Sequence, residues 1–479
     1  MSGRECLIDP VATLFPSRAE RERLDDKLTR DLPSANERIA AGSVVPTLDF
    51  DAFRVELAGF DFIEPRPLDD VLEWSIAQIE RGVVHTTHPR YFGLFNPAPA
   101  FPAQCADRVA GAFNPQLATW TTSPVAVEIE AHVIRHLARR AGLPAGSTGH
   151  FTSCGSEANR TATLCALTSA EPRFATDGAR AFAGAPVVYV SRDSHLAWLK
   201  IAHEAGIGRA AVRLVATDGA GRLDARALRD RIAADRAKGC VPVLLAATAG
   251  TTNAGMIDPL VVCAEIARAE RLWYHVDAAW GGALIVDDGL KASLRGIEDA
   301  DSITIDAHKW FATTMGAGMF LTRRPVVLSS VFHVSTTFMP SEHENLDPYV
   351  TTAQWSRRFA GLRLFLALAA AGWSGYADHV RRSIQLVELL RRKLAERAWT
   401  IANDSPLAVL CVEPPAGREE VRSIARRVLA SGRAWVGATK FEGRDVIRIC
   451  VTHGEATAAD IAELVAALEA RGPSGAPGA

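Results

Sequence analysis

Short apolar runs alternate with helical stretches between residues 150 and 325, and this alternation constrains the fold more than any other feature. The helical stretches include Asp224–Lys238 and Leu260–Glu270. Almost wholly apolar strands that are joined by helices are typical of a mainly parallel sheet covered on both faces. The predicted strands are Val187–Val190, Val212–Ala216, Val241–Ala247, Leu272–Val276, Ile303–Ile305 and Met319–Thr322. The sequence therefore predicts an α/β fold with a ligand site at the carboxyl ends of its strands.

Residues 1–85 are predicted to form a helical arm rather than an independent core. Helices are expected at Arg18–Arg30, Asp49–Leu57 and Pro67–Arg81, with prolines and glycines between them. The apolar stripes of these helices need another surface to cover them, and a second copy of the chain would provide it. We therefore expect a dimer-forming arm.

Residues 86–372 are predicted as a large domain and residues 373–471 as a small α+β domain. The expected elements are helices at Ala103–Ala112, Ala126–Gly142, Ala360–Ala371 and 376–398, and strands at Ala408–Val412 and Val446–Val451. The polar run at about 330–350 is long for a passive connector, so we expect a mobile lid or a loop exchanged between subunits there. Residues 472–479 are expected to be a disordered tail.

The composition of the 479 residues argues against several classes of protein. The net charge of −2 gives no electrostatic basis for binding nucleic acid or an anionic membrane. No apolar run reaches membrane-spanning length, and the first residues lack the apolar segment of a signal peptide. The eight cysteines are scattered, so neither a disulfide framework nor a metal site is expected. We expect a cytoplasmic protein.

Three polar clusters coincide with predicted strand ends or helix starts. Gly149–Asn159 leads into a helix predicted at Arg160–Thr168, and amides at a helix start suit either a phosphate or a plain N-cap. Asp277 ends a strand and precedes two alanines, so it could cap a turn or hold a ring nitrogen protonated. Lys309 follows another strand beside His308. Burial there would disfavour the ammonium form, and only a neutral amine attacks a carbonyl, whereas an ordinary lysine would reach solvent.

Together the three clusters supply a phosphate cradle, an acid for a ring nitrogen and an amine nucleophile. These are the groups that a protein needs to hold pyridoxal 5′-phosphate (PLP). Because they occur in order and near strand ends, their combination favours a PLP site with the cofactor covalently bound to Lys309.

The chain resembles the group II PLP-dependent amino-acid decarboxylases, which include the aromatic-L-amino-acid, glutamate and diaminobutyrate decarboxylases. The resemblance runs from about His85 to Glu469 and rests on the ordered motifs HPRYFGLFNP, TSCGSEAN, ATAGTTNAGMID, HVDAAWGG, DAHKW and WSRRF. It implies the fold-type I PLP architecture and a homodimer with active sites at the subunit interface. It also implies that an L-amino acid loses its α-carboxylate through an external aldimine and a quinonoid, giving an amine and CO2.

The resemblance assigns roles to individual residues of this sequence. Lys309 would form the internal aldimine, Asp277 would pair with the pyridinium nitrogen, and His195 would stack on the ring and meet the substrate carboxylate. Thr252 would lie near the ring hydroxyl or the substrate carboxylate, and Ala279 would lie against the other ring face. The remaining cofactor-binding positions are Gly155, Ser156 and His308 at the phosphate, Ser356 across the subunit interface, and Asp306.

The resemblance also places residues around the substrate. Arg448 would lie near a substrate carboxylate, and a structural ion pair is an equal explanation for this residue. Diamine-specific relatives carry an acid near the position of Ala118, and its absence here argues against a diamine substrate. An aromatic and a polar side chain both remain open. The other positions that would line the pocket are Leu94, Phe95, Asn96 and Gln116.

A tyrosine on the mobile loop assists protonation at Cα in this family, and the matching position here is Phe338. In related plant enzymes the replacement of this tyrosine by phenylalanine accompanies aldehyde formation with O2. The expected product is an amine, with His195 or water as the proton donor, and an O2-consuming aldehyde synthase is the alternative. An aminotransferase and a non-catalytic scaffold are further alternatives. The motifs HPRYFGLFNP and DAHKW argue against the aminotransferase, and the intact Lys309, Asp277 and His195 argue against the scaffold.

Overall fold

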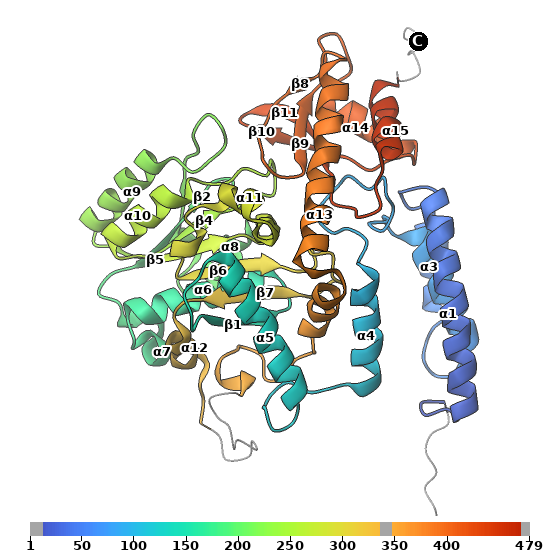
Figure 1. The fold of residues 1–479 in the computed structure, drawn as a ribbon, viewed down its shortest axis with the longest axis horizontal. Helices are drawn as coiled ribbons and strands as arrows, with labels where there is room; N and C mark the ends of the chain where they lie inside the picture. The colour runs from blue at the N-terminus through green and yellow to red at the C-terminus, as the bar shows by residue number, and fades with distance from the viewer. Residues whose placement is uncertain (1–12, 336–346, 471–479) are drawn as a thin grey trace, which may run out of the picture.

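The computed structural model describes residues 13–335 and 347–470, and its largest sheet has seven strands (Figure 1). The strand order is β1-β7-β6-β5-β4-β2-β3. Neighbours from β3 to β6 pair in parallel, and β7 lies antiparallel to both β6 and β1. The strands are β1 (Thr148–Thr152), β2 (Pro186–Ser191), β3 (Val212–Val215), β4 (Val241–Thr248), β5 (Trp273–Asp277), β6 (Ser302–Asp306) and β7 (Gly318–Thr322). The predicted mainly parallel α/β sheet is confirmed.

Both faces of this sheet are covered, because successive side chains of a strand point in opposite directions. On β2, Val187 and Tyr189 pack in one apolar core, whereas Val188 and Val190 pack in another. The first core includes residues of α5 (Pro124–Ala141), α9 (Ala225–Ala237) and α10 (Leu260–Glu270). The second core includes residues of α6 (Gly155–Ala170), α8 (Ala197–Glu204) and α12 (Pro325–Phe332).

The N-terminal region contains the three predicted helices. They are α1 (Arg18–Ala41), α2 (Phe50–Ala58) and α3 (Leu68–Gly82), and α1 continues past Arg30 through Pro33. Figure 1 shows α1 and α3 side by side at the margin of the molecule. Neither α2 nor α3 buries a residue fully, and apolar side chains that remain exposed include Leu32, Phe50, Val55, Leu57, Leu68 and Ile79. Pairing of this arm with a second copy stays a prediction.

The C-terminal region forms a second sheet in the order β10-β11-β9-β8. Its elements are β8 (Thr400–Ile401), β9 (Val409–Glu413), α14 (Val421–Ala430), β10 (Gly437–Phe441), β11 (Arg444–Cys450) and α15 (Ala458–Glu469). Strands β9 and β11 were predicted, and β8 and β10 were not. The long helix α13 (Gly361–Ala395) covers both predicted helices before this sheet, with a break at Gly372, where φ is 65°.

Two details of the prediction were wrong near residue 155. The helix expected at Arg160–Thr168 already begins at Gly155, and β1 was not predicted. Further helices of the described region are α4 (Phe101–Phe113), α7 (Phe174–Asp177) and α11 (Asp288–Lys291). Phe338, the central part of the expected lid and the expected tail at 472–479 lie outside the described residues. Within residues 13–335 and 347–470, no helix is both long and apolar enough to span a bilayer.

A buried ion pair joins α5 to the segment that precedes α13. The guanidinium of Arg357 contacts the carboxylate of Glu130, and the two side chains are only 4% and 5% exposed. Arg357 Nη1 also donates to the carbonyl oxygen of Phe151 in β1 (3.0 Å), and the Gly361 amide donates to Glu130 Oε1 (3.0 Å). One pair therefore fixes the relative positions of α5, β1 and the start of α13.

We predict that Arg357→Met lowers the free energy of unfolding by about 3–5 kcal/mol, because it leaves Glu130 buried without its cation. The control is Arg18→Met, which removes an exposed pair with Glu22 and should change that energy by less than about 1 kcal/mol. Urea unfolding followed by circular dichroism at pH 7 measures both variants. Equal changes in the free energy of unfolding in the two variants would show that the buried pair contributes no more than the exposed one.

Candidate active site

The carboxyl ends of β4, β5 and β6 meet at one end of the sheet, beside a cavity of about 190 Å³. The strand register creates this meeting, since Thr248 lies opposite Asp277 and Asp277 lies opposite Thr304. The cavity is lined by Phe95, Cys154, Gly155, Ser156, Asn159, His195, Thr248, Gly250, Thr252, Asp277, Ala279, Trp280, Asp306 and Lys309. Most of the cofactor-binding residues predicted from the sequence therefore surround one cavity.

Lys309 and Asp306 form a charged pair at this cavity. Lys309 Nζ lies 3.1 Å from Asp306 Oδ2, and the Asp306 side chain is buried. The carboxylate faces the start of α6, where a Cβ added to Gly155 would lie 2.9 Å from Asp306 Oδ2. Only glycine fits at position 155 without a shift, and the positive end of the α6 dipole favours a negative charge beside it.

His308 is buried beside the loop that follows Lys309 and is not among the residues that line the cavity. Its Nδ1 accepts a hydrogen bond from the Ala317 amide (3.3 Å), and its Nε2 lies 3.7 Å from Asp306 Oδ2. Burial lowers the pKa of His308, which favours the neutral ring. The contact of His308 with a phosphate stays a prediction.

His195 lies in the loop after β2 and lines the cavity. Its Nδ1 accepts a hydrogen bond from the Ala197 amide (3.2 Å). The hydroxyl groups of the preceding Ser194 and of Thr248 lie 2.8 Å apart and tie this loop to the end of β4. The imidazole is thus oriented by its own loop and faces the same space as Lys309.

Asp277 accepts two hydrogen bonds at the end of β5. Asn159 Nδ2 donates to Oδ2 (2.8 Å), and the Ala279 amide donates to Oδ1 (3.2 Å). Asn159 belongs to the motif TSCGSEAN, but no role was predicted for it. An asparagine on the buried face of a helix needs polar partners, and this signal could have singled it out.

Aromatic side chains close one wall of the cavity. Phe95 stacks on Trp280 with ring centres 4.2 Å apart, and Trp280 stacks on Trp310 at 5.1 Å. The Arg448 guanidinium lies over the other side of this wall, 4.7 Å from the centre of the Phe95 ring. Of these four residues, only Phe95 and Arg448 were predicted as site residues.

Within the described part of the chain, no group of three or more His, Cys, Asp or Glu residues could hold a metal ion.

Arg448 is buried and donates to backbone carbonyl oxygens. Its Nε contacts the oxygens of Thr252 (2.9 Å) and Asn253 (3.0 Å), and its Nη1 contacts that of Gly93. Arg448 therefore links the loop after β4 to the segment that carries Phe95. These contacts are hydrogen bonds to the backbone and not the structural ion pair that was one of the two explanations for Arg448. The other explanation, a contact with a substrate carboxylate, stays a prediction.

The other predicted substrate and interface residues lie outside the cavity lining. Leu94 is 49% exposed, and Asn96 Nδ2 contacts Met315 Sδ at 3.0 Å. Gln116 Nε2 lies 3.4 Å from Ser356 Oγ, which brings two of the predicted positions together. Ala118 is buried. The roles of these five residues stay predictions.

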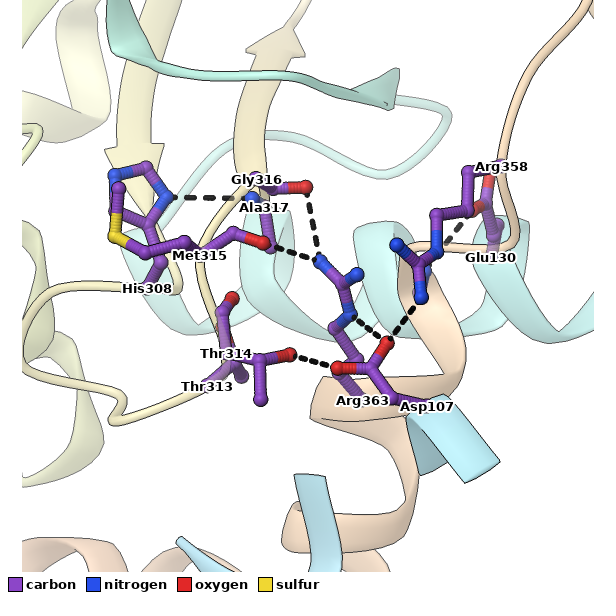
Figure 2. A network of polar contacts seen from close by, with 11 residues as sticks. Asp107, Glu130, His308, Thr313, Thr314, Met315, Gly316, Ala317, Arg358 and Arg363 are labelled. Atoms are coloured by element: carbon purple, nitrogen blue, oxygen red, sulfur yellow. Dashed lines mark hydrogen bonds and ion pairs between the residues drawn. The ribbon is translucent and has the colours of Figure 1, made fainter. Parts of the chain in front are cut away.

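Figure 2 shows the polar network that holds the loop between β6 and β7, directly after Lys309. Arg363 on α13 donates from Nη1 to the carbonyl oxygens of Met315 (2.9 Å) and Gly316 (3.0 Å). Its Nε donates to Asp107 on α4 (2.8 Å), and the exposed Arg358 contacts the same carboxylate (3.0 Å). The loop that carries the lysine is thus anchored to two helices.

A family model described as the pyridoxal-dependent decarboxylase conserved domain matches residues 61–412. The tryptophan decarboxylase 2 of Oryza sativa subsp. japonica is 26% identical, over 81% of this chain and 81% of that protein. The aromatic-L-amino-acid decarboxylase of Bacillus atrophaeus is 26% identical, over 89% of this chain and 90% of that protein. An Oryza sativa TDC solved with PLP and tryptamine is 23% identical, with a TM-score of 0.88 over 95% of this chain and 98% of that chain. The structural likeness confirms the predicted fold.

We predict that Arg363→Met speeds hydrogen exchange of the amides in residues 307–317 by tenfold or more. The reason is that two buried carbonyl contacts and an ion pair disappear together, and about 1.4 kcal/mol of opening free energy corresponds to a factor of ten. The matched control is Arg358→Met, because Arg358 is 64% exposed and contacts the same Asp107. Hydrogen–deuterium exchange with mass spectrometry measures the loop. Similar exchange in both variants would show that Arg363 does not anchor it.

Proposed function

The chain belongs to the pyridoxal-dependent decarboxylases and is a PLP-dependent carboxy-lyase, and from this premise we propose that it removes the α-carboxylate of an L-amino acid to give an amine and CO2. The observation that carries the proposal is that Lys309, Asp277 and His195 line one cavity. A nucleophilic amine, a carboxylate and an imidazole are the side chains that this reaction requires.

The residues of the cavity fit the cofactor. The first amides of α6, at Gly155 and Ser156, have no acceptor within their own helix and are available to a phosphate. A Cβ at Gly155 would crowd Asp306, so the cradle needs glycine there. Asp277 supplies a carboxylate for a ring nitrogen, and Ala279 adds little bulk beside it. Bound at Lys309, PLP supplies an electron sink for the negative charge that remains at Cα when CO2 leaves.

The side chains of the protein then have separate tasks. Lys309 provides the amine that binds the cofactor and is displaced by the amine of the substrate. Asp277 holds a proton on the ring nitrogen. His195 meets the substrate carboxylate, and its ring nitrogen is the group that we propose as proton donor to Cα. Phe95 and Trp280 would present an apolar wall to a bound substrate, and Trp310 packs against Trp280.

An aromatic L-amino acid is the substrate class that we propose to test first. Two curated relatives with similar sequences are named for tryptophan and for aromatic amino acids. The aromatic wall around Phe95 and Trp280 suits a flat side chain. A polar side chain is the competing class, because the sequence leaves it open.

We also propose that the enzyme works as a homodimer in the cytoplasm. The exposed apolar side chains of α2 and α3 give the arm a surface to bury against a second copy. Ser356, whose Oγ accepts a hydrogen bond from Gln116 Nε2, is the residue that we expect to act across the subunit interface.

Replacing Lys309 with alanine should abolish CO2 release and the visible absorbance of bound cofactor, because no other amine lines the described cavity. The control is Lys238→Ala, which removes an exposed lysine at the end of α9 and should keep both signals. Absorbance spectra and 14CO2 release from carboxyl-labelled L-amino acids measure the outcome. Unchanged CO2 release by Lys309→Ala would sink the proposal.

An O2-consuming aldehyde synthase is the second candidate, and the phenylalanine at position 338 favours it. We predict that the wild type releases mainly amine and that Phe338→Tyr changes the product little, since His195 is the proposed proton donor. Oxygen-electrode and product assays on the same amino acids measure this. Stoichiometric O2 uptake with H2O2 and aldehyde would establish the second candidate instead.

A further inference from the structure

A row of buried polar side chains runs along β5 away from the cavity. Trp273, His275 and Asp277 are alternate residues of this strand and so lie on the same face of the sheet. Ser302 on β6 is paired directly with His275. Asn159 reaches the same row from α6, and all five side chains are buried.

Hydrogen bonds connect these five side chains into one chain. Trp273 Nε1 donates to Ser302 Oγ (2.8 Å), and Ser302 Oγ lies 2.8 Å from His275 Nδ1. His275 Nε2 lies 3.0 Å from Asn159 Oδ1, and Asn159 Nδ2 donates to Asp277 Oδ2 (2.8 Å). The chain begins at a group that can only donate and ends at the carboxylate in the cavity.

We propose that Asn159, His275, Ser302 and Trp273 act as a positioning relay that holds Asp277 as an ionised acceptor for the ring nitrogen of the cofactor. The inference rests on the proposed function and deepens it. It concerns how the acid of the site is kept charged, and no role at the cofactor was assigned to these four residues by the sequence.

The direction of the relay follows from both ends. A tryptophan N–H cannot accept, so Ser302 receives that hydrogen and is free to give its own hydrogen to His275 Nδ1. At the other end, two oxygens would repel if Asn159 turned its carbonyl toward Asp277, so its amide nitrogen must face the carboxylate. Asn159 Oδ1 then needs a donor, and His275 Nε2–H is that donor. The two arguments place the single ring proton on Nε2.

A neutral His275 agrees with this arrangement. Burial lowers the pKa of His275 to about 4, so the ring carries one proton near neutral pH. A second proton on Nδ1 would point at the hydroxyl hydrogen that Ser302 donates to this nitrogen, and the two hydrogens would repel each other. Thr304 Oγ1 also lies 3.3 Å from Nε2 and can share its hydrogen. Each bond of the relay therefore orients the next one toward Asp277.

The test compares PLP with 1-deazapyridoxal 5′-phosphate, in which a C–H group replaces the ring nitrogen. Cofactor is removed from the full-length protein, and the Kd of each compound is measured by absorbance titration. The wild type should bind PLP at least tenfold more tightly than the deaza compound. Asn159→Ala should reduce this preference by about tenfold, because a hydrogen bond to a charged group is lost. A purely structural role would weaken both compounds equally.

Replacement of His275 tests the direction of the relay. His275→Gln keeps an N–H near Asn159 Oδ1 and should retain most of the preference for PLP, whereas His275→Leu should lose it. Ser302→Ala is a second variant that leaves Asp277 and Asn159 untouched and should reduce the preference in part. Thr163→Val, one turn along α6 from Asn159, is the matched control for changes in the buried face of that helix. Circular dichroism checks that each variant is folded.

Three results would each overturn the relay. They are equal losses for both compounds in Asn159→Ala, equal preference for PLP in His275→Gln and His275→Leu, and a wild type without any preference for PLP over the deaza compound. These results differ from failure of the proposed function, which would appear as a wild type that neither binds PLP nor releases CO2.

Discussion

The parallel pairing of β5 with β6 is the constraint on which the site depends. It sets Asp277 opposite Thr304, and the chain then needs only a few residues after β6 to bring Lys309 to the same end of the sheet. Because both strands are buried on both faces, a shift in their register would move polar and apolar side chains into the wrong layers. Apolar packing on one face and hydrogen bonds between buried polar side chains on the other therefore fix the distance between the acid and the amine.

The loop of residues 307–317 that follows β6 has a second consequence. It returns the chain as the antiparallel strand β7, and the loop between them is held by Arg363 and Asp107 from two helices outside the sheet. Burying an arginine is costly unless its donors have partners. Nε and Nη1 of Arg363 have three partners, and these contacts tie the loop that carries Lys309 to α4 and α13.

Six strands of the seven-stranded sheet, and the positions of Asp277 and Lys309, could be predicted because their signals are local. A short apolar run that is followed closely by Asp277 or Lys309 is visible without knowledge of its neighbours, whereas His195 was assigned only by resemblance to the family. β1 was missed because Thr148–Thr152 has a glycine and a histidine among its residues and owes its place to pairing with β7, far along the chain. Asn159 lies on the buried face of a helix, which signals a need for polar partners, but its partners on β5 could not be identified from the sequence. Contacts with distant segments leave no local pattern that identifies the partner.

Asp277 and Asp306 differ in the partners that the structure gives them, and the difference bears on their chemistry. Asp306 lies beside the cation of Lys309, so its charge is partly balanced within the protein. Asp277 receives its hydrogen bonds from an amide side chain and a backbone amide, which bring no positive charge. An arginine at position 159 would bind the carboxylate more strongly but would also cancel the field that a cationic ring nitrogen needs. A neutral asparagine, oriented by a neutral histidine, fixes the carboxylate in place and leaves its charge for the ligand.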